Sequence, residues 1–392
     1  MPDKNPCPVS FLFLVLLAAG CSKAPQFHAN ATLEDKISIT HEHLQTPGAV
    51  VGIYRGEDVL YEAALGKANI ANAEPLTTDH RFRVGSLAKM FVAHVLLQLV
   101  DQGRIGLDDS VAAYLPDLQL DPRVTLRQLA NHTSGLPNYI ADARVKRAFA
   151  EQPRHHFTPE QLMEWVRTHP LAGKNQPGER WQYSNINYVL LGRLIEQLEQ
   201  KPLADVIQTR ICQPLQMQST FYSVNAYIPS PFASGYQFGD ESGPIYWKGQ
   251  GSIPHDVTDH SPSMWHGAGA MVSNLPDLKR FAQALARGEM LSTDARRQQL
   301  QWIRSDYPVD YAYGLGLIRY IDLVGHNGYV PGYQATLTIQ GIDRPPGEQT
   351  IVIVLANCYS SPNWEEPANA MLYVIMRHLT GRSYAPPGWV GW

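Results

Sequence analysis

Cysteine is scarce in this chain: only four of its 392 residues are Cys, and none stands in a C-x-x-C pair. No cluster of His and Cys has the spacing of a zinc site. The pairs His41/His43 and His155/His156 are too close-set for the H-E-x-x-H spacing on a helix, so we expect them on the solvated surface. The sequence therefore indicates no metal site.

The chain also lacks an excess of acidic or basic residues. Charged residues make up 17% of the chain, and the formal net charge of −4 is spread without a long run of either sign. No basic stripe marks a nucleic-acid surface, so we expect no nucleic-acid partner. Apolar residues make up 44%, and the length is sufficient for a large core in one large domain or two.

The N-terminus carries an apolar run that is too short to cross a bilayer comfortably. Lys4 precedes residues 9–19, which are apolar except for Ser10, and small residues lead into Cys21. The run fits the apolar region of an export signal. The small residues before Cys21 resemble a bacterial lipobox, which implies a signal peptide over residues 1–20 and a lipid on the Cys21 thioether. An ordinary signal peptide cleaved nearby is the alternative.

Export places the mature chain in the bacterial cell envelope or periplasm. Ser22 follows Cys21 where an acidic residue often marks inner-membrane retention, so an outer-membrane lipoprotein is favoured. Cys212 and Cys358 are then the remaining thiols. They either pair in an oxidising compartment or stay buried and free.

Strand-like segments gather at the two ends of the chain and helix-like segments fill its middle. The expected strands are residues 49–54, 59–65, 82–84, 313–320, 334–340 and 350–356. The expected helices are residues 32–44, 86–102, 125–131, 159–168, 187–198, 203–212, 276–287 and 363–378. Residues 229–262 are rich in Pro, Gly and Ser and are expected to form a long surface excursion.

This layout predicts a fold of the α/β class, of α+β type. We expect one antiparallel sheet that both termini complete, flanked by helices, with a mostly helical region inserted over about residues 105–300. Residues 21–45 are expected to form a tether and a first helix. The helix over residues 86–102 is apolar on nearly all sides and should lie in the centre of the protein.

Ser86 and Lys89 form the first candidate site. At positions i and i+3 of a helix their side chains share a face, so a nucleophile and a base can meet. Unpaired N–H groups of a first helical turn favour a developing anion at Ser86. Apolar neighbours are expected to desolvate Lys89 and lower its pKa. An N-cap serine with a surface lysine is the alternative for the motif taken alone.

Two further groups contain polar side chains next to turn signals. Tyr183-Ser184-Asn185 offers a phenol and a carboxamide side by side before an expected helix. That phenol can shuttle a proton if a cation lowers its pKa. His326-Asn327-Gly328 lies between two expected strands, where Gly328 lets a ligand approach the backbone and the N–H of Tyr329 can bind an oxyanion. Taken alone, Ser184 or Asn185 is a helix cap and residues 326–328 are a hairpin turn.

The three groups together resemble the motifs of class C β-lactamases and related DD-carboxypeptidases. Their order is Ser86-x-x-Lys89, Tyr183-x-Asn185 and His326-x-Gly328. Surrounding segments are also similar to this family: 83–85, 96–103, 107–111, 132–136, 177–178, 313–316 and 332–333. The resemblance spans about residues 46–358 and implies a β-lactamase/transpeptidase-like serine hydrolase domain over residues 46–385.

The resemblance also implies roles for these residues. Ser86 forms an acyl-enzyme, Lys89 takes or relays its proton, and Tyr183 protonates the leaving group. Asn185 orients the substrate and Lys89. The backbone N–H groups of Ser86 and Tyr329 hold the oxyanion, while His326, Asn327 and Gly328 belong to the motif that contacts the substrate. The substrate is a small peptide or a β-lactam, and no metal or organic cofactor is implied.

The chain departs from the family pattern at two places. His326 stands where β-lactamases of this class carry lysine, so a clamp on a substrate carboxylate is expected to be weak and to titrate at about pH 6–7. Ile318 occupies the place where some carboxypeptidases have arginine, and Arg319 is expected to face away. Asn327 stands where Thr or Ser is commoner.

The main expectation is a peptidase, of the DD-carboxypeptidase kind, that acts on D-amino-acid peptides of the cell wall. An esterase or weak β-lactamase on the same fold is a second possibility. A penicillin-binding sensor lipoprotein without turnover is a third, although the presence of Ser86, Lys89 and Tyr183 argues against a site that has lost its activity. Protein partners and the oligomeric state stay open.

Overall fold

The computed structural model describes residues 22–23, 25–169, 174–246, 251–307, 309–363, 365–386 and 389–390. The expected signal peptide and the lipidation site at Cys21 lie outside the described residues. Within them, no helix is both long and apolar enough to cross a membrane.

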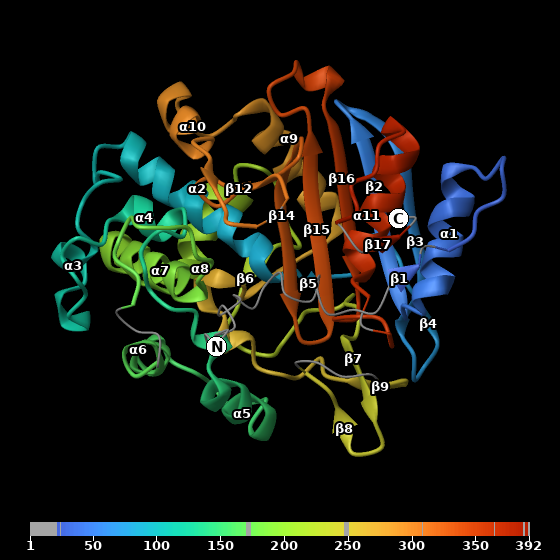
Figure 1. The fold of residues 1–392 in the computed structure, drawn as a ribbon, viewed down its shortest axis with the longest axis horizontal. Coiled ribbons are helices and arrows are strands. Elements are labelled where there is room, and N and C mark those ends of the chain that lie inside the picture. The colour runs from blue at the N-terminus through green and yellow to red at the C-terminus, as the bar shows by residue number, and fades with distance from the viewer. Residues whose placement is uncertain are drawn as a thin grey trace, which may run out of the picture.

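A single antiparallel sheet organises the fold (Figure 1). In the described part of the chain it has nine strands, in the order β11-β12-β13-β14-β15-β16-β2-β3-β4. The strands from the N-terminal side are β2 (Gly48–Arg55), β3 (Asp58–Asn69) and β4 (Glu74–Pro75). Those from the C-terminal side are β11 (Ile303–Arg304), β12 (Tyr311–Tyr313), β13 (Ile318–Tyr320), β14 (Leu323–Val330), β15 (Tyr333–Gln340) and β16 (Thr350–Ala356).

The two halves of the chain join where β16 pairs with β2, with Ile353 opposite Gly52. The expectation of an antiparallel sheet completed by both termini and flanked by helices is confirmed. A short parallel pair, β1 (Ser22–Lys23) with β17 (Trp389–Val390), lies apart from this sheet.

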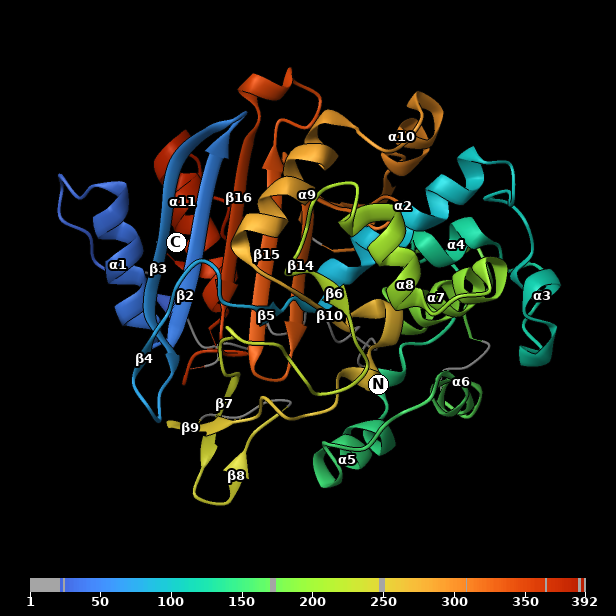
Figure 2. The same cartoon turned by 180° about the vertical axis from the view of Figure 1, so that it is seen from behind.

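Helices cover both faces of the sheet, which explains why its central strands are apolar on both sides. β16 reads Thr-Ile-Val-Ile-Val-Leu-Ala, and every residue of it is buried. α1 (Leu33–Leu44) and α11 (Pro367–Thr380) lie on one face, and α9 (Leu275–Arg287) lies on the other (Figures 1 and 2).

A largely helical region lies beside the sheet and contributes half of the candidate site. Its helices are α2 (Ala88–Asp101), α3 (Val111–Tyr114), α4 (Leu126–Ala130), α5 (Ala143–Glu151), α6 (Pro159–Arg167), α7 (Asn185–Glu199), α8 (Leu203–Ile207) and α10 (Thr293–Gln299). As predicted, α2 is central and nearly wholly buried. The ring of Phe91 on α2 stacks on that of Phe281 on α9, with centroids 4.0 Å apart.

Two predicted elements are wrong in their details. Residues 313–320 were expected to form one strand, but they end β12 and begin β13. Gly314 N–H donates to the Leu317 carbonyl at 2.8 Å and Gly316 has φ +76°, which makes the turn between the two strands. Residues 326–328 were expected to form a turn, yet they lie inside β14. The turn after β14 comes at Pro331-Gly332, where Gly332 has φ +83°.

The surface excursion expected over residues 229–262 contains all three strands of a small sheet and several buried side chains. β7 (Tyr236–Asp240) pairs with β8 (Gly243–Pro244) and β9 (Ile253–Asp256). Tyr236 and Gln237 are buried. In another small sheet, β10 (Met271–Ser273) pairs with both β5 (Phe82–Arg83) and β6 (Phe221–Tyr222).

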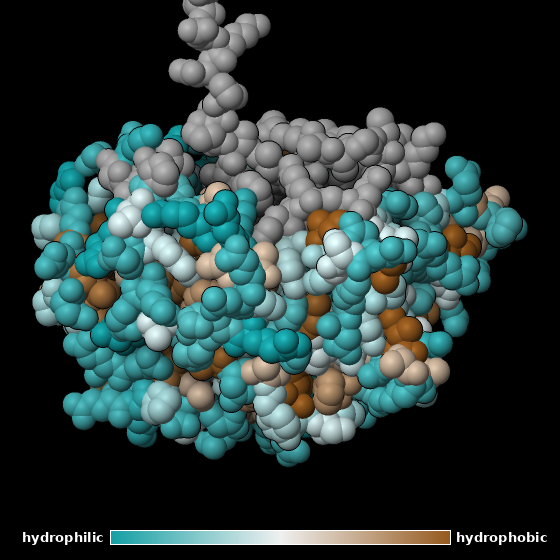
Figure 3. Space-filling model, turned by 90° about the horizontal axis from the view of Figure 1, so that it is seen from below, coloured by the Kyte–Doolittle hydropathy of each residue, from teal (hydrophilic) through white to brown (hydrophobic). Residues whose placement is uncertain are grey.

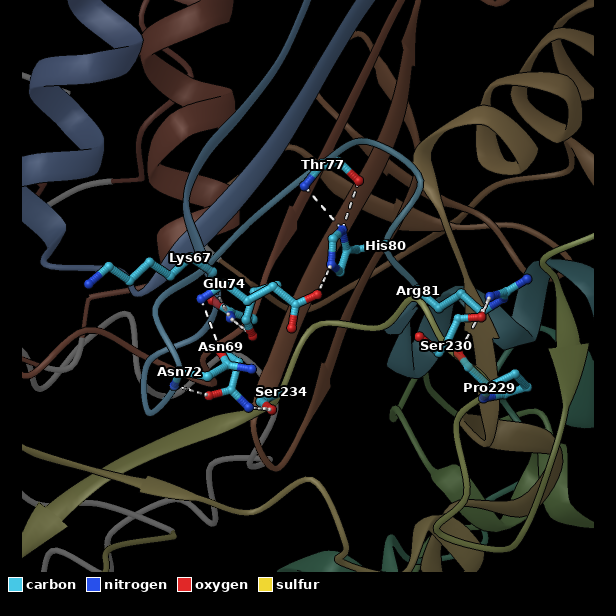
Figure 4. A network of polar contacts seen from close by, with 12 residues as sticks. Lys67, Asn69, Asn72, Glu74, Thr77, His80, Arg81, Pro229, Ser230 and Ser234 are labelled. Atoms are coloured by element: carbon cyan, nitrogen blue, oxygen red, sulfur yellow. Dashed lines mark hydrogen bonds and ion pairs between the residues drawn. The ribbon is translucent and has the colours of Figure 1, made fainter.

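Polar contacts tie the start of this excursion to the segment before Ser86 (Figure 4). Arg81 donates to the carbonyl oxygen of Ser230 at 2.8 Å, and Asn69 Nδ2 donates to Ser234 Oγ at 3.1 Å. The chain that leads into β5 is thereby fixed against residues 229–234.

The cysteines that the structure describes are both free and buried. Cys212 ends a π-helical turn (Gln208–Cys212) and Cys358 follows β16, so the unpaired alternative applies to them. On the face drawn in Figure 3, apolar residues form separate patches among hydrophilic ones.

Candidate active site

Ser86 lies at the junction between the sheet and the helical region. It belongs to a single 3₁₀ turn (Gly85–Leu87) that leads into α2, rather than to α2 itself as predicted. Its side chain is 5% exposed and opens into a cleft. The residues that line this cleft are Ser86, Ile140, Asn185, Gln237, Tyr246, Trp265, Tyr329, Pro331 and Tyr359.

Lys89 is fully buried, and its Nζ has three oxygen neighbours. Nζ lies 2.9 Å from Ser86 Oγ, 2.9 Å from Asn185 Oδ1 and 2.6 Å from the Ala268 carbonyl oxygen. Burial lowers the pKa of Lys89 well below its usual value, in the direction that its apolar neighbours predicted.

These three neighbours decide what a neutral Lys89 can do. The amide oxygen of Asn185 and the carbonyl oxygen of Ala268 only accept hydrogen bonds, so they take both N–H bonds of an amine. The remaining lone pair then faces Ser86 Oγ, whose hydroxyl can donate to it. In this form Lys89 is placed to receive the Ser86 proton.

Asn138 fixes the orientation of the Asn185 amide. Asn138 Oδ1 accepts from both the backbone N–H and the Nδ2 group of Asn185, each at 3.3 Å. With Nδ2 so occupied, Oδ1 of Asn185 faces Lys89. Asn185 is the first residue of α7, and the preceding Ser184 bonds the Pro137 carbonyl rather than capping the helix.

Tyr183 supplies a second hydroxyl at the nucleophile. Its Oη donates to Ser86 Oγ at 3.0 Å, and Lys89 Nζ lies 4.9 Å from the centroid of its ring. A lowered pKa of this phenol was expected only if a cation acted on it, and that condition is not met, because burial raises the pKa. Tyr183 is therefore held as a neutral proton donor.

Two backbone N–H groups flank the nucleophile. Val330 and Tyr333 flank a two-residue hairpin turn and form a hydrogen-bonded pair. In an antiparallel sheet hydrogen-bonded and non-hydrogen-bonded pairs alternate, so the next pair, Tyr329 with Gln334, is not hydrogen-bonded. The Tyr329 N–H therefore points away from β15. It points towards Gly85, where an added Cβ would lie 2.6 Å from the Tyr329 nitrogen. The Ser86 N–H belongs to a first helical turn and has no acceptor within it. The structure thus brings the two expected oxyanion donors together.

Gly328 is required by the close approach of two backbones. An added Cβ would lie 2.0 Å from the Val84 carbonyl oxygen and 2.9 Å from the Ser86 nitrogen. β13 pairs with β14 only as far as Gly325, so beyond that residue the edge of β14 faces the nucleophile.

His326 is buried and cannot act as the titrating clamp that the sequence suggested. Its Nδ1 faces the Asn327 carbonyl oxygen at 2.5 Å and must carry the proton, so Nε2 accepts from Tyr313 Oη at 3.0 Å. Burial is the main cause that lowers its pKa to about 3, and Lys89 acts in the same direction at any pH where its amine is protonated. The imidazole is therefore neutral near pH 7, and the predicted titration at about pH 6–7 does not hold.

Asn327 and Arg319 face away from the nucleophile. Asn327 alternates with His326 along β14 and donates to Tyr329 Oη at 3.3 Å, on the side of α11. Arg319 forms an ion pair with Asp310 at 3.3 Å, so it faces away from the site, as its place in the strand predicted. Ile318 packs in the cluster that contains Tyr183.

Sequence reasoning assigned no role to His132, although it lies in a segment similar to the family. Its ring packs against Tyr183 with centroids 4.3 Å apart, and its Nδ1 accepts from Asn187 Nδ2 at 3.1 Å. Glu366 and Asn369, at the start of α11, were also missed; both contact the Tyr329 hydroxyl. The family-like segment 132–136 was the signal that could have pointed to His132, whereas no local motif marks Glu366 and Asn369, which join the site only through folding.

No group of three or more His, Cys, Asp or Glu residues in the described ranges could hold a metal ion. The chemistry that the described side chains offer is nucleophilic: a hydroxyl, a buried amine, a phenol and two amide donors.

Comparisons with known proteins show which family and which proteins this chain is similar to. A family model described as Beta-lactamase matches residues 33–374. "Penicillin-binding protein 4*" of Bacillus subtilis is 30% identical over 345 residues, which cover 85% of this chain and 72% of that protein. A D-aminopeptidase of Cereibacter sphaeroides is 25% identical over 349 residues, 88% of this chain; the chain spans 63% of that relative's length.

The solved structures that resemble this chain include a D-stereospecific amidohydrolase from Streptomyces sp., which superposes with a TM-score of 0.73. It is 29% identical, and the match covers 88% of this chain and 98% of that one.

Replacing Gly328 with alanine should impair acylation, because the new Cβ would force the Val84–Ser86 backbone away from β14. Loss of one oxyanion donor typically costs about 100- to 1,000-fold in rate. The acylation rate is measured by stopped-flow with a chromogenic ester. Gly347→Ala, where an added Cβ meets nothing within 4 Å, is the matched control. Equal acylation rates in the two folded variants would contradict this placement of the N–H groups.

His326 should make unfolding depend on pH rather than give activity a step near neutrality. Its pKa is about 3 when folded and about 6.5 when unfolded, so between these values the unfolded chain binds one more proton. The free energy of unfolding should fall by about 2 kcal/mol more in the wild type than in His326→Gln between pH 6.5 and 5. Urea unfolding at both pH values tests this, and parallel curves would show that His326 titrates normally.

Proposed function

The chain belongs to the beta-lactamase family, as its motifs predicted, and from this premise we propose that it is a serine hydrolase that cleaves amide bonds of D-amino-acid peptides through an acyl-enzyme on Ser86. The observation that carries the proposal is the position of Ser86 Oγ. It lies 2.9 Å from Lys89 Nζ and 3.0 Å from Tyr183 Oη, beside the N–H groups of Ser86 and Tyr329.

Acylation follows from these positions. Ser86 Oγ attacks the carbonyl carbon and passes its proton to the lone pair of Lys89. The Ser86 and Tyr329 N–H groups hold the negative oxygen of the tetrahedral adduct. Tyr183 donates its proton to the leaving nitrogen as the C–N bond breaks, and Lys89 carries the proton that restores the phenol. The net transfer is one proton from Ser86 to the leaving amine.

Deacylation reverses the proton path. Water takes the place of the leaving amine and attacks the ester carbon, and its proton goes to the Tyr183/Lys89 pair. The C–O bond to Ser86 breaks, and the proton returns to Oγ. Both steps use only this chain's own side chains and backbone amides.

The substrate class is supported by the activities of the similar proteins. One is a D-aminopeptidase and another a D-stereospecific amidohydrolase. Among the described residues that line the cleft there is no Arg or Lys, so a terminal carboxylate finds no cation there. This composition supports general D-amide cleavage more than the DD-carboxypeptidase form of the expectation.

The proposed location is the bacterial cell envelope, with a lipid anchor at Cys21. The proposal rests on the apolar run over residues 9–19 and the small residues before Cys21. Peptides that contain D-amino acids occur in the cell wall, so an enzyme anchored there would meet such substrates.

A substrate panel tests the proposed function. D- and L-aminoacyl amides, peptidyl-D-Ala-D-Ala, penicillin, a cephalosporin and a short-chain ester are incubated with the wild type, Ser86→Ala and the exposed control Ser242→Ala. We expect D-selective amide turnover that Ser86→Ala lowers about 1,000-fold or more. Mass spectrometry should find the acyl group on the Ser86 peptide.

Rapid cephalosporin hydrolysis without amide turnover would instead show a β-lactamase. Equal turnover in Ser86→Ala, with no adduct on the wild type, would refute the serine mechanism.

A further inference from the structure

One wall of the cleft contains a buried carboxylate that the proposed mechanism does not use. Glu366 precedes α11 and is 7% exposed. Its Oε2 accepts from Tyr329 Oη at 2.8 Å and from Asn369 Nδ2 at 2.7 Å. None of the ion pairs in the described part of the chain includes Glu366, whereas the neighbouring Glu365 lies 3.7 Å from His43.

The charge of Glu366 is not needed for these contacts. A neutral glutamine has the same shape and could accept from Tyr329 and Asn369 in the same way. A buried carboxylate without a cation is costly unless something positive approaches it. The positive end of the α11 dipole supplies only part of that compensation.

Glu366 lies directly behind the cleft surface. Tyr329 and Tyr359 both line the cleft, with ring centroids 6.1 Å apart. Burial is the main cause of the raised pKa of both phenols, and a negative charge on Glu366 adds to it. Burial also raises the pKa of Glu366, while its hydrogen bonds with Asn369 and Tyr329 act in the opposite direction, so an approaching cation favours its charged form. Tyr246 and Trp265 add two more aromatic rings to the same cleft.

Among the described residues that line the cleft, none is an Arg or a Lys that would oppose a negative charge on Glu366. His326 is neutral, and Lys89 is buried against Ser86, Asn185 and Ala268. Aromatic faces backed by a carboxylate attract cations and repel anions.

The carbonyl chemistry fixes where a substrate cation would lie. The proposed oxyanion donor is the backbone N–H of Tyr329, and the side chain of the same residue bonds Glu366. In an aminoacyl substrate the α-ammonium is separated from the carbonyl carbon by one carbon atom. When that carbonyl oxygen binds the Tyr329 N–H, the ammonium comes close to Tyr329, and the Tyr329/Tyr359 wall is within its reach.

We propose that Glu366 is the specificity-determining residue that selects substrates with a free α-ammonium group at the Tyr329/Tyr359 wall. The preferred substrates are then D-aminoacyl amides and peptides with a free D-amino terminus, cleaved after that first residue. This inference rests on the proposed function and specifies which end of the substrate the site recognises.

The test compares a D-aminoacyl p-nitroanilide with its N-acetyl derivative, which differs in the ammonium charge. The wild type should prefer the free amine in kcat/KM by about tenfold or more, as expected for an interaction with a charged group. Glu366→Gln should lower that preference by about 10- to 100-fold, chiefly through KM. Glu365→Gln, the same change one residue earlier, should keep the wild-type preference.

Two results would overturn the inference, and a third would overturn the proposed function. Equal wild-type kcat/KM for the two substrates would show that the charge is not recognised, and this measurement needs no folded variant. A Glu366→Gln enzyme that loses activity equally on both substrates would show that Glu366 only positions Tyr329. No turnover of either substrate and no acyl group on Ser86 would instead refute the proposed function itself, which separates the two failures.

Discussion

The buried amino group of Lys89 is the point at which the parts of this molecule meet. Its Nζ bonds Ser86 in the turn before α2, Asn185 at the start of α7 and the carbonyl of Ala268, the last residue of a short turn (His266–Ala268). An ammonium in this position is costly because water is absent, while an amine satisfies both obligate acceptors and keeps a lone pair for Ser86. The burial that makes a charged Lys89 costly therefore also favours the neutral amine that can act as the base.

That constraint explains why the nucleophile stands between two architectural units. The helical region provides Lys89, Tyr183 and Asn185, and the sheet provides the edge of β14. Gly85 and Gly328 allow the two backbones to approach closely enough for the N–H groups of Ser86 and Tyr329 to flank one oxygen atom. A side chain at either glycine would separate the units, so the oxyanion site depends on packing of backbone on backbone.

The sequence predicted the elements whose signals are local and repeated. The all-round apolar pattern of residues 88–101 placed α2 at the centre, and apolar runs at both ends of the chain indicated one shared sheet. The motif residues Ser86, Lys89, Tyr183 and Asn185 do meet. Residues 326–328 were misplaced in a turn because Asn-Gly is a common turn signal, whereas the glycine here serves close contact with Val84. The neutral state of His326 and the presence of Glu366 could not be predicted, since burial and partners distant along the chain determine both.

The account depends most directly on the protonation state of Lys89. An NMR titration of the protein with ¹³Cε/¹⁵Nζ-labelled lysine, with Lys89→Arg used for assignment and the exposed Lys201 as internal reference, measures it. We predict that the Lys89 signal titrates well below the ordinary lysine pKa, so that an amine faces Ser86 near neutral pH. A Lys89 signal that titrates at the ordinary lysine pKa would contradict the account, because the amine would then be absent when Ser86 must lose its proton.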